Sequence, residues 1–250
     1  MAADRHRHDL FLNSRLLARP VMENVWTSKA LIASILLDRR VEPRIGFVDH
    51  VPGGLPKEML STFAYISAVD QVLAHVRGQN LDDEEADRLR CSVNDAHYRL
   101  MSLRPWPDLS EEERADSHLG TYELCRLSII LYSNAILFPV PVASGWHVEL
   151  LGQLRVLLDT TRLLFWPEDV SSLAIWSLCL ASIAAFATKH RVYFEQTLRD
   201  LLIERALVRW RDVTAILKQF LWSDAACSQG LLVLRERLQL PEDASMARDA

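Results

Sequence analysis

Apolar residues recur along this chain at the spacing of a helix rather than of a strand. The first example is a face lined by Val25, Ile32, Ile35 and Leu36. Residues three, four or seven positions apart lie on the same side of an α-helix, which has 3.6 residues per turn. No segment alternates apolar and polar residues over more than a few positions, as a half-buried strand would. The pattern therefore predicts an all-α protein.

Prolines, acidic turns and capping residues mark where the helices begin and end. Residues 41–56 contain three prolines and three glycines and predict a loop, after which Pro56 suits the first turn of a helix. Four acids at 82–85 complement the dipole at the start of the next helix, and Ser110 with Glu113 predicts a capping box. We expect about nine helices, over residues 25–40, 56–77, 82–103, 110–138, 146–165, 170–188, 191–206, 208–222 and 225–238.

These helices are expected to form one multi-helix domain with a largely apolar core. The domain should span residues 21–240, between a flexible N-terminal segment at 1–20 and a disordered tail at 241–250. The first ten residues lack the apolar core of a signal peptide.

Two long stretches without an ionised side chain raise the question of a membrane span. In the first, residues 129–146, Pro139 and Pro141 would leave backbone groups unsatisfied in lipid. The second, residues 171–188, is rich in Ser and Ala, so its hydrophobicity is modest. We therefore expect no membrane span. The first stretch should be the end of a buried helix with a proline-stiffened exit, and the second a buried central helix.

Composition supports a helical globular protein and argues against direct binding of nucleic acid. The 250 residues are 50% hydrophobic and 24% charged, with only 8 glycines and 10 prolines. Few turn residues, with Leu and Ala dominant, favour helix. The formal net charge is -5, whereas a protein that holds DNA needs a basic face to neutralise phosphates.

Neither a metal nor another cofactor is expected. The four cysteines, Cys91, Cys125, Cys179 and Cys227, are far apart and form no C-x-x-C pair. None of the eight histidines has a second histidine or a carboxylate at a spacing that predicts a metal site. We expect four reduced thiols in an intracellular protein.

No nucleotide-binding, zinc-protease or hydrolase motif is present, so candidate site residues come from an apolar, aromatic pocket. The candidates are Tyr132 and Asn134, in the first charge-free stretch, with Trp176 and Arg191. Three of them also have a structural interpretation. Trp176 suits a core, and Asn134, if buried, needs a hydrogen-bond partner in the backbone, in the neighbourhood of Tyr132 or in a ligand. Arg191 has Glu195 at i+4, and we favour that ion pair over a ligand contact.

Three blocks of the second half resemble the C-terminal half of the fungal-specific transcription factor domain. They are CRLSIILYSNAILFPVPVASGW at 125–146, LAIWSLCLASIAAFATKHRVYFEQTLRDLL at 173–202 and VRWRDVTAILKQFLWSDAACSQGLLVLRERL at 208–238. The family pattern in the third block is carried by Leu217, Phe220, Leu221, Trp222, Cys227 and Gly230. GGLPKEML at 53–60 resembles the loop that opens this domain. The blocks are loose apolar and aromatic patterns rather than catalytic signatures.

The resemblance implies an all-helical effector domain that acts in gene regulation in the nucleus. Some relatives, sterol-sensing regulators among them, bind a hydrophobic small molecule in this domain. The family reads DNA with a six-cysteine, two-zinc cluster, and no such cluster precedes Cys91 here. We therefore expect no zinc and no direct contact with nucleic acid. The expected partners are a hydrophobic small molecule, a protein partner or a second copy of the chain.

Two other functions stay open. One is a stand-alone cytoplasmic enzyme of the isomerase or cyclase type, or a binding protein, in fungal specialised metabolism. Such an enzyme needs mainly shape, exclusion of water and a few polar contacts, so it would leave no nucleophile or metal motif. The other is a purely structural or interaction role.

Overall fold

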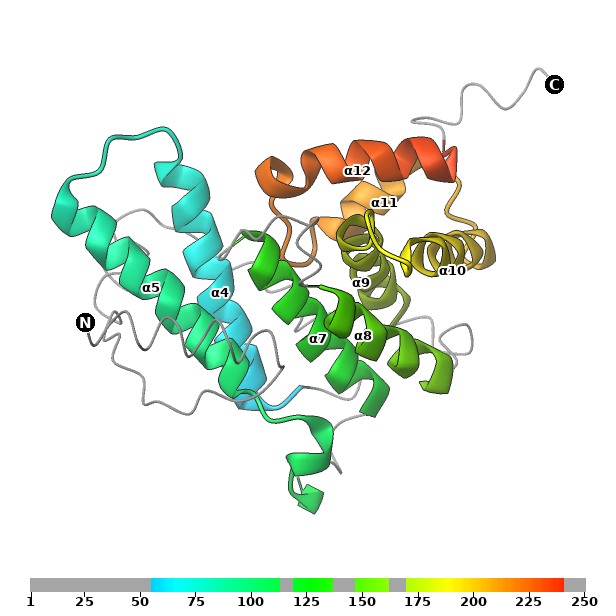
Figure 1. Cartoon of the computed structure of the whole chain (residues 1–250), viewed down its shortest axis with the longest axis horizontal. Coiled ribbons are helices and arrows are strands. Elements are labelled where there is room, and N and C mark those ends of the chain that lie inside the picture. Colours follow the sequence, from blue (N-terminus) through cyan, green and yellow to red (C-terminus); the bar gives the residue numbers. More distant parts are fainter. Residues whose placement is uncertain (1–54, 113–118, 137–146, 162–169, 241–250) are drawn as a thin grey trace.

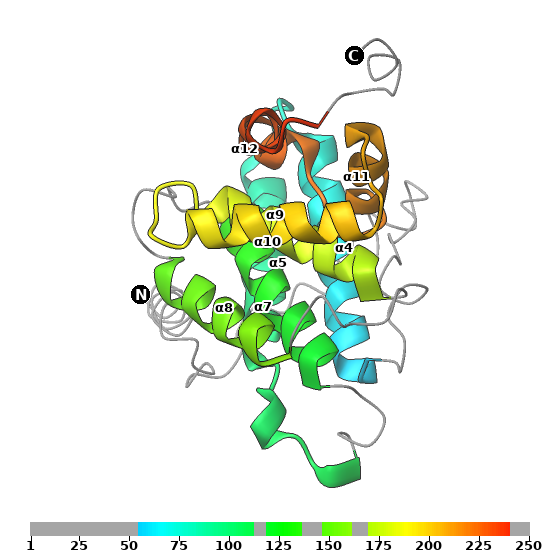
Figure 2. The same ribbon diagram turned by 90° about the vertical axis from the view of Figure 1, so that its right-hand side faces the viewer.

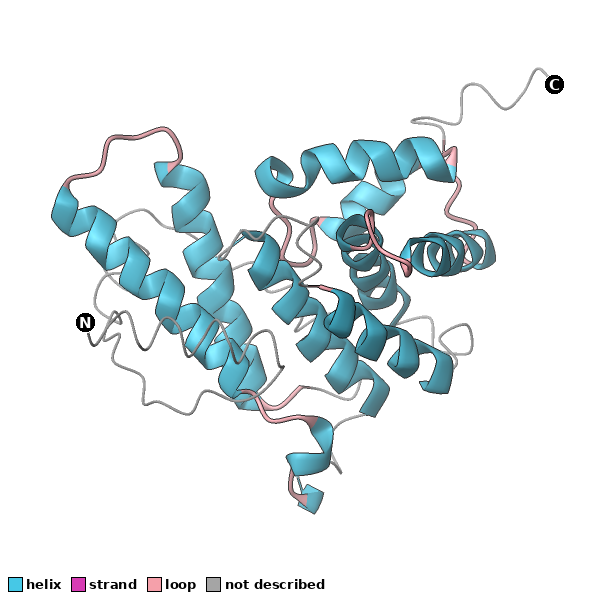
Figure 3. Cartoon of the chain, viewed as in Figure 1, coloured by secondary structure: helices cyan, strands magenta, loops and turns pink. Residues whose placement is uncertain are grey.

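The computed structural model describes residues 55–112, 119–136, 147–161 and 170–240, and the regular structure in these ranges is helical throughout (Figures 1 and 3). The predicted all-α class is confirmed. Eight α-helices and one 3-10 helix lie wholly within these ranges, which hold no strand. They are α4 (Lys57–Val76), α5 (Asp83–Ser102), η1 (Trp106–Asp108), α7 (Leu119–Ile136), α8 (Val148–Thr161), α9 (Ser171–Ala184), α10 (Arg191–Glu204), α11 (Trp210–Leu217) and α12 (Asp224–Leu238).

The first two described helices begin and end where the sequence predicts. α4 starts directly after Pro56 and ends two residues before Gly78, whose φ of 79° is left-handed and costs glycine little. At the start of α5, the Asp82 carboxylate accepts a hydrogen bond from the Glu85 N–H at 2.8 Å, and the Glu85 carboxylate accepts one from the Asp82 N–H. The four acids thus supply a complete capping box as well as a favourable charge.

Two later helices are shorter than the predicted ranges 170–188 and 208–222, and local contacts explain both corrections. α9 ends at Ala184 because the chain turns there, and the Thr188 hydroxyl donates to the Ala185 carbonyl and accepts from the His190 N–H. α11 ends at Leu217. The Leu221 carbonyl that follows accepts a hydrogen bond from the Trp176 indole instead of from a helical N–H.

Several expectations lie outside the described residues. They are the first helix at 25–40, the flexible segment at 1–20, the Glu113 half of the second capping box, the helix ends at 138 and 165, the proline-stiffened exit and the tail at 241–250.

Helix α9 is the centre of the C-terminal half. It packs against α7, α10, α11 and α12, and in Figure 2 α10 lies in front of it. Its residues are apolar or small on every side, and most of them are buried, as expected for a helix covered all round. α4 and α5 pair at the other side of the molecule, and α7 joins them to α8 and α9 (Figure 1).

The helices around α9 bear on whether the second charge-free stretch, residues 171–188, spans a membrane. Its charge-free surface faces neighbouring helices, and none of the helices in the described ranges has the length and apolar character to cross a membrane.

A glycine sets how closely α12 approaches α9. A Cβ added at Gly230 would lie 2.5 Å from Cγ2 of Ile183, which is well inside van der Waals contact. The missing side chain therefore lets the two helices meet at this point.

Candidate functional site

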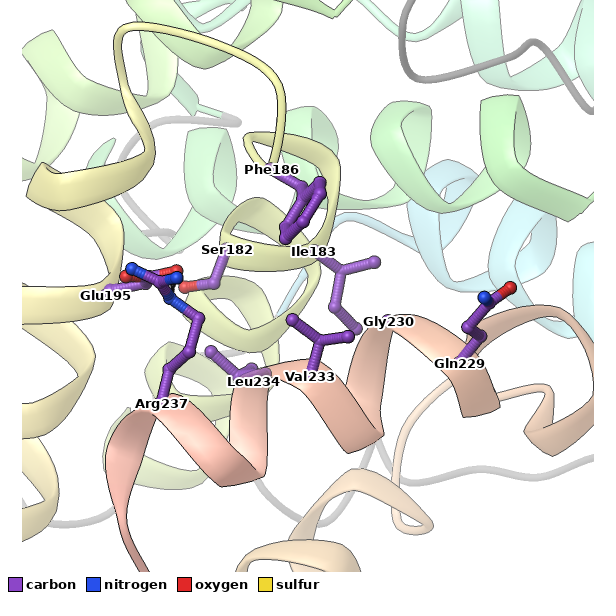
Figure 4. A pocket seen from close by; sticks show the side chains of 9 residues that line it. All are labelled: Ser182, Ile183, Phe186, Glu195, Gln229, Gly230, Val233, Leu234 and Arg237. Atoms are coloured by element: carbon purple, nitrogen blue, oxygen red, sulfur yellow. Dashed lines mark ion pairs between the residues drawn. The ribbon is translucent and has the colours of Figure 1, made fainter.

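A groove of about 400 Å³ opens between α9, α10 and α12 (Figure 4). Its volume falls within the range of small-molecule sites. The end of α9 and the turn after it contribute Ser182, Ile183 and Phe186, α10 contributes Glu195, and α12 contributes Gln229, Gly230, Val233, Leu234 and Arg237.

The walls of the groove are apolar. Gly230, Val233, Leu234 and Arg237 are spaced as one face of a helix, so α12 presents a continuous strip to the groove. Ile183 stands over Gly230 in Figure 4, and Phe186 forms the rim with 50% of its surface exposed. An exposed phenylalanine beside a hollow of this size is a surface that a ligand can cover.

One end of the groove is charged. Nε of Arg237 lies 2.7 Å from Oε1 of Glu195, and Nε of Arg191 lies 3.5 Å from the same oxygen. The Arg191 guanidinium also sits 5.5 Å from the centre of the Phe186 ring. The predicted pair between Arg191 and Glu195 is confirmed. Two guanidinium groups share one carboxylate, so this end carries an excess of positive charge.

Ser182 adds a buried hydroxyl to the same end of the groove. Its residue is 3% exposed, and its Oγ has no hydrogen-bond partner among the described residues. Buried hydroxyls in proteins are nearly always hydrogen-bonded. A molecule in the groove would supply the missing partner.

Three of the predicted site residues lie in the core instead of in this groove. Tyr132 and Asn134 are buried on α7, and Trp176 is fully buried on α9. The Trp176 indole donates to the Leu221 carbonyl at 2.8 Å and stacks on Phe220, with ring centroids 5.4 Å apart. Core packing of Trp176 is thus confirmed. A ligand role for these three residues stays a prediction, and Arg191 alone of the four lies beside the groove.

The sequence interpretation missed Ser182 and Arg237. Arg237 sits in the last turn of a helix, where a cation is ordinary, and Ser182 is one of several serines in an apolar helix. Only the packing of α12 on α9 and α10 brings the two side chains to one place.

A histidine and a serine also meet between α5 and α7. Nδ1 of His97 lies 3.0 Å from Oγ of Ser133, and the residues are 1% and 0% exposed. Burial lowers the pKa of His97 to about 3, because an apolar environment disfavours the charged imidazole. Such a histidine is a weak base at neutral pH, and no solvent reaches the serine. The contact joins two helices.

A buried ion pair strengthens the same region. The Glu123 carboxylate accepts hydrogen bonds from Nε and Nη2 of Arg126 at 3.0 and 2.9 Å and from the Trp106 N–H at 2.6 Å. The Glu123 carboxylate thus links η1 to α7, and its hydrogen bonds are made inside the protein.

The described part of the chain contains no cluster of three or more His, Cys, Asp or Glu side chains that could hold a metal ion. All four cysteines are free. Cys91 is partly exposed and the other three are buried.

Comparisons with known proteins give no relative. No protein-family model, no curated protein and no solved structure matches the chain. The resemblance to the fungal-specific transcription factor domain therefore stays a prediction.

Proposed function

We propose that this chain is a helical effector domain of the regulatory type that it resembles. It binds a hydrophobic small molecule or a protein partner, and it has no zinc cluster of its own for reading DNA. The observation that carries the proposal is the groove on α9, α10 and α12, with its apolar walls and its charged end. The groove lies within two of the three blocks, 173–202 and 208–238, on which the resemblance rests.

Two buried polar pairs of the described core support binding over catalysis. His97 with Ser133 and Glu123 with Arg126 are enclosed by protein and engaged with each other. A general base or a nucleophile has to reach its substrate, and these groups do not open onto the groove.

The position of the groove suits a regulatory role. A molecule seated there touches three helices at once, and α9 is the one on which α7, α10, α11 and α12 pack. A ligand shifts a protein between conformations only to the extent that it binds one of them better. If α9, α10 and α12 move relative to one another, a ligand that contacts all three binds one arrangement better than the other.

Native mass spectrometry of the full chain, purified from its own organism, tests the proposal. We expect either a lipophilic adduct or a co-purifying transcription regulator, together with nuclear localisation of the tagged protein. A protein that stays in the cytoplasm and converts an added lipophilic compound would show instead an enzyme of specialised metabolism and would overturn the regulatory function.

A further inference from the structure

We propose that the groove between α9, α10 and α12 binds a carboxylic acid with an aliphatic body, and that Arg237 and Ser182 recognise its carboxylate. This assignment rests on the proposed binding function and adds the chemical class of the ligand.

The geometry of Arg237 leaves donors for an anion. Within the described residues its side chain is held by one ion pair, from Nε to Glu195 at 2.7 Å, and it remains 37% exposed. A guanidinium has five N–H donors in a rigid fork. Because Glu195 fixes the Nε side, the terminal nitrogens are oriented and available. A carboxylate is the group that a guanidinium binds best, through two parallel hydrogen bonds.

The charges around Glu195 favour an anionic head group on the ligand. Arg191 and Arg237 share the carboxylate of Glu195, which is only 14% exposed. An incoming anion meets the excess positive charge, whereas an ammonium group meets two guanidinium groups around a carboxylate that is already paired. The groove should therefore prefer an anionic head to a cationic one.

The hydroxyl of Ser182 supplies a second donor at this end (Figure 4). It is buried and has no partner in the described part of the chain. A carboxylate held by Arg237 can accept a hydrogen bond from it. The observation is independent of the ion pair, and it matters here because Ser182 lines the groove.

The rest of the groove fits an aliphatic body. Ile183, Val233 and Leu234 form its walls, Phe186 covers the rim, and Gln229 stands at the end away from the ion pair (Figure 4). At about 400 Å³ the groove is near the lower end of the range for small-molecule sites. A single aliphatic chain suits it better than a large ring system.

Isothermal titration calorimetry of the full chain tests the ligand class with three probes of equal chain length: decanoate, decan-1-ol and decylammonium. We expect decanoate to bind about tenfold more tightly than decan-1-ol, because it adds a charged hydrogen bond. Decylammonium should bind most weakly of the three. Equal binding of all three probes, or tighter binding of decylammonium, would overturn the assignment.

Variants then test the two residues. Arg237→Gln should weaken decanoate binding about tenfold and leave decan-1-ol within about twofold. Ser182→Ala should weaken decanoate binding about fivefold without lowering the melting temperature, since it removes a hydroxyl that has no partner among the described residues. Arg88→Gln, which breaks an exposed pair with Glu84 on α5, is the matched control. It should leave all three affinities unchanged.

Val233→Trp fills the groove and separates this assignment from the proposed function. We expect it to abolish binding of every probe while the melting curve shows that the protein is folded. If protein from its own organism carries a lipophilic adduct or a regulator, and the Val233→Trp variant still carries it, the binding function stands and the groove assignment fails. If neither protein carries anything but decanoate binds the groove as described, the ligand class stands and the regulatory function fails.

Discussion

The two sides of this molecule treat polar side chains in opposite ways. Around α5 and α7 they lie inside, where Glu123 pairs with Arg126 and His97 contacts Ser133. Around α9 the interior is apolar and aromatic apart from buried serines such as Ser182, and the charged pair of Glu195 and Arg237 lies at an open groove.

The difference separates structural polar groups from candidate functional ones. A buried group whose hydrogen bonds are all made within the protein has nothing left for a ligand. Arg237, which is exposed and held through one nitrogen, and Ser182, which is buried without a partner in the described residues, still have donors to offer. Burial alone would have pointed to the α5 and α7 side, away from the candidate groove.

The largest expected effect tests the apolar side. Trp176→Ala removes a fully buried indole, its stacking on Phe220 and its hydrogen bond to Leu221. We expect the free energy of unfolding to fall by about 4 kcal/mol, measured by urea denaturation. Phe186→Ala, at the exposed rim of the groove, is the control and should cost less than about 1 kcal/mol. Equal losses would contradict the central role of α9.

The polar side is tested by removing one partner of its buried ion pair. Arg126→Met leaves the Glu123 carboxylate uncompensated in the interior, at a cost of about 3 kcal/mol in urea denaturation. Replacing Glu123 by Leu as well should recover part of this loss, because no buried charge then remains. Arg88→Met breaks an exposed pair with Glu84 and should cost less than about 0.5 kcal/mol. If both arginine variants lost the same amount, the buried pair would not be structural.

His97 makes the stability of the same side depend on pH. Its pKa is about 3 in the folded protein and 6.5 as a free side chain. Between these two pH values the imidazole is therefore protonated in the unfolded chain and neutral in the folded chain. The stabilising contribution is therefore complete above pH 6.5 and is lost as the pH falls towards 3. From pH 7 to pH 5 the loss should be about 2 kcal/mol.

The matching variant is His97→Gln, whose amide does not titrate and can still contact Ser133. Urea midpoints at pH 7, 6 and 5 should fall less steeply for this variant than for the wild type. Identical slopes would place the pH dependence elsewhere, with the burial-lowered pKa of His147 as the next candidate.

The smallest effect compares two helical glycines. Gly230→Ala places a methyl group 2.5 Å from Ile183 Cγ2 and should destabilise the protein by about 1 kcal/mol net, since strain outweighs the gain in helix propensity. Gly152→Ala on α8 meets no atom within 4 Å of the added Cβ and should stabilise by about 0.5–1 kcal/mol. Melting temperatures measure both. A gain at both positions would mean that α12 moves away from α9 at little cost.

Local signals in the sequence predicted much of the fold. Pro56 and the acids at 82–85 placed the starts of α4 and α5, and the charge-free composition of residues 171–188 identified the central helix. The ends of α9 and α11 were not predictable, because they depend on contacts made after folding, such as the bond from Trp176 to Leu221.

The candidate site shows the same limit. The pair of Arg191 and Glu195 followed from their spacing on one helix. The pair of Glu195 and Arg237 joins different helices, and the sequence pattern of neither helix predicts it. The apolar periodicity that identified α12 shows that one of its faces is covered, but not which helices cover it.

The three buried cysteines can report how fast individual helices open to solvent. Cys125, Cys179 and Cys227 lie on α7, α9 and α12, and burial raises the pKa of all three thiols, that of Cys227 to about 12. A thiol-reactive reagent attacks the thiolate, so each cysteine should react only when its own helix opens to solvent. Labelling followed by peptide mass spectrometry would then measure the opening rates of three helices in the wild-type protein. If Cys227 reacted well before Cys179, α12 would open while the centre stayed closed.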